Sequence, residues 1–300
     1  MKIKETPSRI IFRIINTILM LILAFICLIP LWHVLMASFS NPTVLSQNTG
    51  IVFWPLSSPG HPATLKGYEL VLRNVGLARG YANTIFYVGV GTTLCITLCS
   101  VAAYCMSRRK TLFMKYLVVL LTVTMFFSGG LIPTYYVNKT LGIVNTRWVM
   151  IAMGLIGVFY VIILKTSFQQ LPASLEESAA LDGAGHMTIL LKIILPLSKA
   201  TIAVIALFFA VGKWNEYLTA IIYLNNRALY PLQCYLREML VDSSGNQEIA
   251  ISGDATTYNE DFKKLLQYST IIYATLPILA IYPFIQKYFV KGVLIGSIKG

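Results

Sequence analysis

The sequence predicts an all-α membrane protein with six transmembrane helices and both termini in the cytoplasm. Hydrophobic residues make up 56% of the 300 residues, charged residues only 12%, and the mean hydropathy is +0.70. Soluble domains usually carry about 25% charged residues, so this chain has too few polar side chains to solvate a globule of its size. Six apolar stretches also have the roughly 20 residues that a helix needs to cross about 30 Å of hydrocarbon.

The six stretches are expected to form one transmembrane domain that extends over residues 1–300. They are approximately Ile10–Leu31, Tyr81–Met106, Lys115–Pro133, Trp148–Leu164, Ala200–Leu224 and Tyr268–Tyr288. The first stretch follows a basic start, as the apolar core of a cleaved signal peptide does. It is longer than such a core, so we interpret it as a retained transmembrane helix.

The basic residues predict the orientation. If both termini are inside, the inner segments carry 14 basic and four acidic residues, and the outer segments carry ten basic and eight acidic residues. An excess of Lys and Arg marks cytoplasmic segments. The connection 165–199 and the tail 289–300 are therefore expected in the cytoplasm, and the long loops 32–80 and 225–267 outside.

Neither the charged residues nor the cysteines predict a nucleic-acid-binding, metal or redox site. The basic residues behind the net charge of +12 stand at the ends of apolar stretches, so the sequence does not favour nucleic-acid binding. Four of the five cysteines lie within apolar stretches, where free cysteine behaves as a small hydrophobe. The histidines His33, His61 and His186 fall in separate segments. We therefore expect no metal site, no cofactor in this chain and no enzyme active site.

The inner connection 165–199 is rich in helix signals. Ser174 followed by Glu177 predicts a capping box at a helix start. The run Asp182-Gly183-Ala184-Gly185 predicts a stop, because glycine readily adopts the left-handed conformation at a helix end. A second helix is expected from His186 to Leu195, ending against Pro196. Its apolar positions are predicted at Ile189, Ile193 and Leu197.

The same residues resemble a known family, the permeases of ATP-binding-cassette (ABC) importers. That family carries an EAA loop with a Glu-Ala-Ala run, a glycine four residues later, and then Ile-x-Leu-Pro. The positions that match are Glu177, Ala179, Asp182, Gly183, Ala184, Ile193, Leu195 and Pro196, while Ser178 stands where the pattern prefers alanine. The resemblance implies that this loop forms coupling helices that dock in a cleft of a cytoplasmic ATPase.

Further segments resemble the second, shorter permease of maltose-type carbohydrate importers. These are Trp214-Asn215-Glu216-Tyr217 and the C-terminal run 291–300. The segments 127–134 and 230–238 are similar to a narrower group, the oligo- and polysaccharide permeases of Gram-positive bacteria. The resemblance implies a multi-pass protein of the bacterial plasma membrane.

The resemblance also implies a set of partners. These are a second permease subunit, two ATPase subunits, an extracellular solute-binding lipoprotein and membrane lipid. The chain has no G-x-x-x-x-G-K-[ST] segment, so ATP and Mg are expected to bind to the partner ATPase.

Several residues admit two interpretations. Glu177 serves as a capping partner, a docking residue, or both, and Ile193, Leu195 and Pro196 favour packing over direct partner contact. Lys213 and Glu216 are either an ion pair that helps their helix pack or, with Trp214 and Asn215, part of the translocation path. The last residues, including Leu294, Gly296 and Ser297, form either a disordered tail or a tail that contacts the ATPases.

Two rival functions remain open at the level of sequence. The first is the same permease architecture with a non-sugar cargo, since the EAA loop is shared across cargo classes. The second is an ion-coupled secondary transporter, which would favour ionisable groups near the bilayer midplane and an internal repeat. Only Lys213 and Glu216 fit the first of these features, and no repeat is visible.

Overall fold

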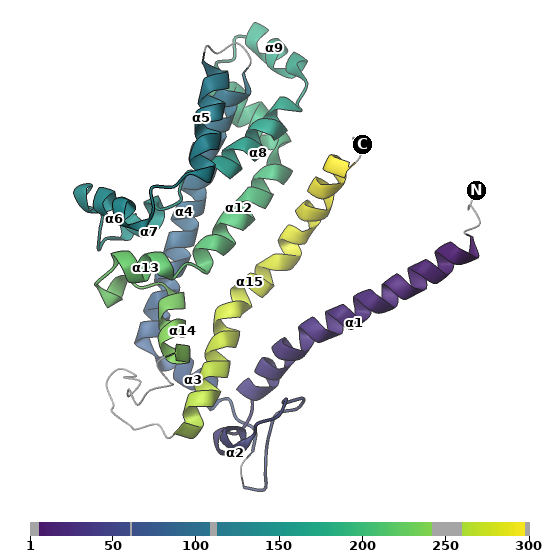
Figure 1. The fold of residues 1–300 in the computed structure, drawn as a ribbon, viewed down its shortest axis with the longest axis vertical. Coiled ribbons are helices and arrows are strands. Elements are labelled where there is room, and N and C mark those ends of the chain that lie inside the picture. The colour runs from purple at the N-terminus through teal and green to yellow at the C-terminus, as the bar shows by residue number, and fades with distance from the viewer. Residues whose placement is uncertain (1–5, 61, 109–112, 242–259, 298–300) are drawn as a thin grey trace. The chain divides into compact units, whose positions relative to one another are not determined.

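The computed structural model describes residues 6–60, 62–108, 113–241 and 260–297, and its secondary structure is almost entirely helical. The helical fold class is therefore confirmed. The chain divides into two compact units, residues 1–75 with 236–276 and residues 76–235 with 277–300. Each unit is described by itself, and Figure 1 traces the chain through both. A single transmembrane domain stays a prediction.

The first unit has a small core beneath a long apolar helix. Its helices are α1 (Pro7–Ser38), α2 (Pro42–Gln47), α3 (Lys66–Arg73) and the first part of α15 (Glu260–Ser297). Ala37, Leu45, Val52 and Leu265 form the core. Most of the large side chains of α1 from Ile10 to Trp32 are exposed. Such a surface is stable in lipid and costly in water.

The second unit is a bundle of longer helices with short helices in the connections between them. In chain order it contains α4 (Val75–Ser107), α5 (Met114–Phe126), α6 (Leu131–Thr140), α7 (Arg147–Ala152), α8 (Val158–Gln169), α9 (Ala173–Leu181), α10 (His186–Ile189), the π-helix η1 (Leu190–Ile194), α11 (Leu195–Leu197), α12 (Lys199–Trp214), α13 (Leu218–Tyr223), the 3₁₀ helix η2 (Arg227–Leu229) and the start of α14 (Leu232–Val241). Helix α8 packs against both α5 and α12. Helix α9 lies at one end of this bundle (Figure 1).

Among the described residues of the second unit, two apolar clusters join its helices. One joins α4, α8, η1 and α12 through residues such as Cys99, Leu164, Ile194 and Ile205, all fully or almost fully buried. The other joins α4, α7 and α13 around Tyr87. Because the buried cysteines Cys95 and Cys99 pack here as small apolar side chains, their role agrees with the sequence-based expectation.

Three described helices are long and apolar enough to cross a membrane alone. They are Pro7–Ser38, Val75–Ser107 and Phe262–Pro283. Among the described residues, two bent helix pairs would raise the number to as many as five. The count of six spans and the cytoplasmic termini stay predictions.

Three predicted spans are wrong as continuous helices. The predicted span 115–133 ends as a helix at Phe126 and bends by 114° before α6. The predicted span 148–164 is broken between α7 and α8, where Gly154 has a φ of +72°. The predicted span 200–224 breaks between Trp214 and Leu218. Apolar residues lie on both sides of each short break, so the mean hydropathy of the whole stretch did not separate the two helices.

The last predicted span is longer than expected. Helix α15 continues to Ser297, so most of the predicted tail 289–300 has helical backbone rather than a separate conformation. Residues 298–300, and residues 242–259 in the predicted outer loop 225–267, lie outside the described part of the chain.

Candidate functional site

The first candidate coupling helix is α9, and it begins two residues earlier than a capping box at Ser174 would allow. Pro172 occupies the N-cap position, and no side chain caps the helix. The predicted capping box between Ser174 and Glu177 is therefore wrong. Proline fixes φ near −65° and tolerates the start of a helix, so Pro172 rather than Ser174 marks the boundary. Ser174 lies on the exposed first turn instead.

The predicted stop after α9 is confirmed in detail. Gly183 has a φ of +83°. Its N–H donates to the Ala180 carbonyl at 3.0 Å, and the Ala184 N–H donates to the Ala179 carbonyl at 2.9 Å. These are the two hydrogen bonds of a Schellman motif. Together with the exposed Asp182 they form the elbow of residues 182–185, which turns the chain from α9 into α10.

The second coupling helix contains a π turn that the sequence did not predict. The Leu195 N–H bonds to the Leu190 carbonyl, five residues back, and the Ser198 N–H then returns to the Ile194 carbonyl at 3.0 Å. Pro196 has no N–H for the Lys192 carbonyl, and its ring would crowd that carbonyl in a regular helix. The wider π turn removes the need for this hydrogen bond and leaves room for the proline ring. Single π turns are frequent at functional sites.

The π turn corrects the predicted apolar face. Ile189, Leu190 and Ile194 are buried, whereas the regular spacing had predicted Ile189, Ile193 and Leu197. Ile193 is only half-buried, and Leu197 is exposed. One extra residue in the turn shifts every later side chain around the helix axis, which explains the error.

The predicted coupling residues separate into an outward set and a packed set. Ala179, Ala184 and Leu195 contact the apolar cluster of the bundle. The exposed residues are Glu177, Ser178, Asp182, Gly183 and Pro196. Leu181 is 89% exposed beside the elbow. An apolar side chain this exposed at a prominent turn is suited to insertion into another protein.

Residues near the end of α4 hold the coupling helices in place, and the sequence did not single them out. Arg108 forms an ion pair with Glu176 of α9, and its guanidinium lies 4.3 Å above the Tyr104 ring. The Tyr104 hydroxyl lies 3.4 Å from Nδ1 of His186 at the start of α10. The signal available in the sequence was the opposite charge of Arg108 and Glu176 on the same predicted side of the membrane.

Burial changes the proton affinity of Arg108. It lowers the pKa of this guanidinium from its usual value, while Tyr104 acts in the opposite direction. Arginine in proteins nevertheless stays protonated at neutral pH. The Arg108–Glu176 contact therefore remains an ion pair.

Lys213 links two helix ends in the second unit. Its ammonium is 2.7 Å from the Glu216 carboxylate and donates to the Met150 and Met153 carbonyls at 2.8 and 2.7 Å. The lysine side chain is 6% exposed. The predicted ion pair is thus present. The two carbonyls at the end of α7 are acceptors that the helix leaves unpaired, so Lys213 also caps α7.

The three residues of the candidate translocation path lie at the break after α12. Trp214 is buried and packs edge-on against Tyr81, with ring centroids 5.6 Å apart. Asn215 is exposed and donates to the Val211 carbonyl, and Glu216 accepts from Lys213 and Thr219. Only Asn215 presents much polar surface. A role in the path stays a prediction.

The predicted ATPase-contacting tail residues lie in the last turns of α15. Leu294, Gly296 and Ser297 belong to its helical backbone. Their contact with an ATPase stays a prediction.

Comparison with known proteins identifies the family. A family described as "binding-protein-dependent transport system inner membrane component" matches residues 96–295. The polygalacturonan/rhamnogalacturonan transport system permease protein YtcP of Bacillus subtilis (strain 168) is 40% identical over 284 residues, covering 94% of this chain and 96% of the relative. Protein LplC of the same organism is 37% identical over 296 residues, covering 99% and 97%.

A solved structure agrees with the helical arrangement. It is a bacterial ABC transporter involved in the import of the acidic polysaccharide alginate. The matching chain is 28% identical with a TM-score of 0.86, and the match covers 96% of this chain and 100% of that one. Because the family match extends over more than half of the sequence, this chain belongs to the inner-membrane components of binding-protein-dependent transport systems, and its resemblance to sugar-importer permeases is confirmed.

Proposed function

We propose that this chain forms half of the translocation path for an oligo- or polysaccharide delivered by an extracellular solute-binding lipoprotein. The observation that carries the proposal is the 40% identity with the polygalacturonan/rhamnogalacturonan permease over 94% of the chain. The alginate importer at a TM-score of 0.86 adds support. A second permease subunit would supply the other half, and two ATPase subunits would bind ATP and Mg.

The elbow of residues 182–185 provides the coupling in this proposal. ATP-driven closure of the ATPases would move α9 and α10, and Ala179 of α9, Ala184 of the elbow and Leu195 of α11 contact the bundle core. Coupling requires an element that both sites bias. The rigid elbow, fixed by the Schellman hydrogen bonds, supplies a mechanical connection of this kind. The bundle would then alternate between inward-facing and outward-facing states, with both termini in the cytoplasm.

A second cargo class has some support. An osmoprotective compounds uptake permease of Synechocystis sp. is 30% identical over 299 residues. A small solute rather than a saccharide polymer is therefore the alternative cargo. The two cargoes differ in size, so an uptake competition would distinguish them.

The test is uptake by membrane vesicles from native cells that express or lack this chain. Labelled acidic and neutral oligosaccharides and a labelled small osmolyte would be supplied with the binding protein in the presence of ATP. We expect ATP-dependent accumulation of an oligosaccharide only where the chain is present. Accumulation of the osmolyte alone would overturn the cargo. Uptake that follows an ion gradient without ATP would overturn the importer mechanism.

A further inference from the structure

A pocket of about 370 Å³ lies where α4 ends, α5 begins and α8 ends. We propose that it binds an anionic phospholipid, with the phosphate at its charged end and an acyl chain along its apolar end. The proposal goes beyond transport itself and does not depend on the cargo. It concerns only the second unit, to which all the pocket residues belong.

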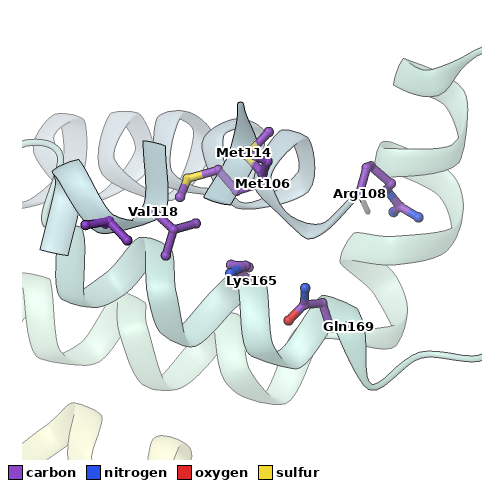
Figure 2. A pocket seen from close by; sticks show the side chains of 7 residues that line it. Met106, Arg108, Met114, Val118, Lys165 and Gln169 are labelled. Carbon is purple, nitrogen blue, oxygen red and sulfur yellow. The ribbon is translucent and has the colours of Figure 1, made fainter. Parts of the chain in front are cut away.

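The charged end of the pocket carries two basic side chains and an amide. Arg108 follows α4, and Lys165 and Gln169 lie one turn apart on α8. Figure 2 shows Lys165 and Gln169 on the same helix, with Arg108 at one end of the pocket. An ammonium, a guanidinium and an amide N–H₂ all donate hydrogen bonds, which is the donor set that a phosphate requires.

Donor capacity at this end is unused among the described residues. Glu176 pairs with Nη1 of Arg108, and Nε and Nη2 of the same guanidinium have almost no accessible surface and no hydrogen-bond partner among the described residues. These two nitrogens are therefore shielded from the open pocket, and its accessible donors belong to Lys165 and Gln169. Lys165 is half-buried, and no described carboxylate pairs with it. Because Glu176 compensates much of the Arg108 charge, Lys165 supplies the net positive charge of the pocket.

The rest of the pocket is apolar and leads toward the surface. Met106, Met114, Val118 and Val119 form its other walls. In Figure 2, Val118 lies at the end of the pocket opposite Arg108. Val119 is 56% exposed.

The exposed apolar surface continues along α5 through Leu120 and Val123. A free phosphate would leave these walls without a partner, whereas an acyl chain would cover them. Basic pockets between transmembrane helices are typical sites for anionic lipid headgroups.

The experiment uses the full chain purified in mild detergent with its associated subunits. Dioleoyl-phosphatidylglycerol, which is anionic, and dioleoyl-phosphatidylcholine, which is zwitterionic, would be titrated separately, and bound lipid would be counted by native mass spectrometry. The variants are Lys165→Gln and Lys165→Arg. Lys139→Gln is the matched control, because it removes an exposed lysine on α6 that lies outside the pocket.

We expect the unmodified protein to bind phosphatidylglycerol more tightly than phosphatidylcholine. Lys165→Gln should weaken the anionic lipid about fivefold, the usual effect of one basic residue near a membrane surface. Lys165→Arg and Lys139→Gln should leave binding within about twofold. Arg108→Gln should weaken it as well, but Lys165→Gln is decisive because it preserves the Arg108–Glu176 pair.

Three results would overturn the proposal. The first is equal binding of both lipids. The second is a loss with Lys139→Gln as large as with Lys165→Gln, which would indicate a general surface-charge effect. The third is displacement of phosphatidylglycerol by millimolar inorganic phosphate or glycerol 3-phosphate, which would identify a soluble phosphate site without a role for the acyl chain.

Discussion

At the scale of single residues, Gly183 and Lys213 satisfy backbone groups that would otherwise lack partners. Gly183 adopts a left-handed conformation at φ +83°, and its N–H and that of Ala184 satisfy two carbonyls of α9. Lys213 does the same for two carbonyls at the end of α7. At Gly183 the absence of a side chain permits the left-handed turn after α9. At Lys213 a long side chain reaches the carbonyls at the end of α7. Substitutions at these two positions therefore test local geometry directly.

The loss of transport on replacing Gly183 should depend on how poorly the new residue tolerates left-handed backbone, and not on the size of its side chain. No atom lies within 4 Å of a Cβ built at this position, so space does not oppose a substitution. Left-handed backbone costs an ordinary residue roughly 1–2 kcal/mol, and asparagine tolerates it best. We expect Gly183→Val to lower ATP-driven uptake about tenfold and Gly183→Asn to retain most of it.

The measurement is vesicle uptake together with the amount of subunit in the membrane. Both variants should reach the membrane at normal levels. Full uptake by the valine variant would refute a coupling role for the elbow.

Removing Lys213 should destabilise the bundle more than removing Glu216. Lys213→Met leaves a largely buried carboxylate and two carbonyls without their donor, and losing one partner of a buried pair typically costs about 3–5 kcal/mol. Glu216→Gln leaves Lys213 bonded to both carbonyls and should cost about 1 kcal/mol. The double substitution should recover part of the loss. The melting temperatures of the two single variants and the double variant would be measured in detergent, with size-exclusion chromatography as the readout of unfolding. Equal melting temperatures for the two single variants would contradict this account.

At the scale of elements, the link between α4 and α9 separates two neighbouring glutamates by role. Glu176 pairs with Arg108, whereas Glu177 is exposed on the same helix. The first therefore fixes the position of α9 in the isolated chain, and the second is available to a partner. This distinction is not visible in the sequence, where the two residues are adjacent and identical.

Hydrogen exchange should distinguish the two glutamates. We expect Glu176→Gln to raise the exchange rate of the α9 amides about fivefold, because a partly exposed ion pair contributes up to about 1 kcal/mol. Glu177→Gln should leave these rates unchanged and reduce the amount of ATPase that co-purifies with the chain. Equal exchange in both variants would show that the Arg108 pair does not hold α9.

The elements also show how far the sequence predicts this site. The stop at Gly183 follows from local backbone chemistry, and the sequence located it correctly. The start of α9 at Ala173 was missed because Ser174 and Glu177 also fit a capping box. The π turn was missed because the residues before Pro196 also fit the spacing of a regular helix. The break after Trp214 was missed for a different reason. It is stabilised by carbonyls of α7, about 60 residues earlier in the chain, and no local pattern reports that contact.

At the scale of the whole molecule, the family places the chain in a membrane transport system, and its composition agrees. Fold class and family could be predicted because apolar length and the EAA loop are properties of continuous sequence. The Arg108–Glu176 ion pair and the lipid pocket could not, because each depends on helices brought together from distant segments. The helical backbone of α15 reaches Ser297, so residues 289–297 of the predicted tail are part of this helix.

Deleting Val293–Gly300 should reduce ATP hydrolysis linked to transport. The deletion removes the end of α15, and if this end contacts the ATPases, their activity in the complex should fall at least about twofold. The measurement is substrate-stimulated ATP hydrolysis by the reconstituted complex, with ATPase content determined in parallel. An unchanged rate at normal subunit content would indicate that the end of α15 contributes nothing to the ATPases.

The Schellman elbow has a consequence for assembly. Its two Schellman hydrogen bonds join backbone groups of residues 179–184, and no atom lies within 4 Å of a Cβ built at Gly183. The turn is thus built from its own backbone before any partner arrives. Segments that fold on binding must pay an ordering entropy at that moment, whereas a preformed turn does not. Subunit association at this point is therefore expected to proceed as docking of a rigid shape, with a rate set by encounter and not by folding of the loop.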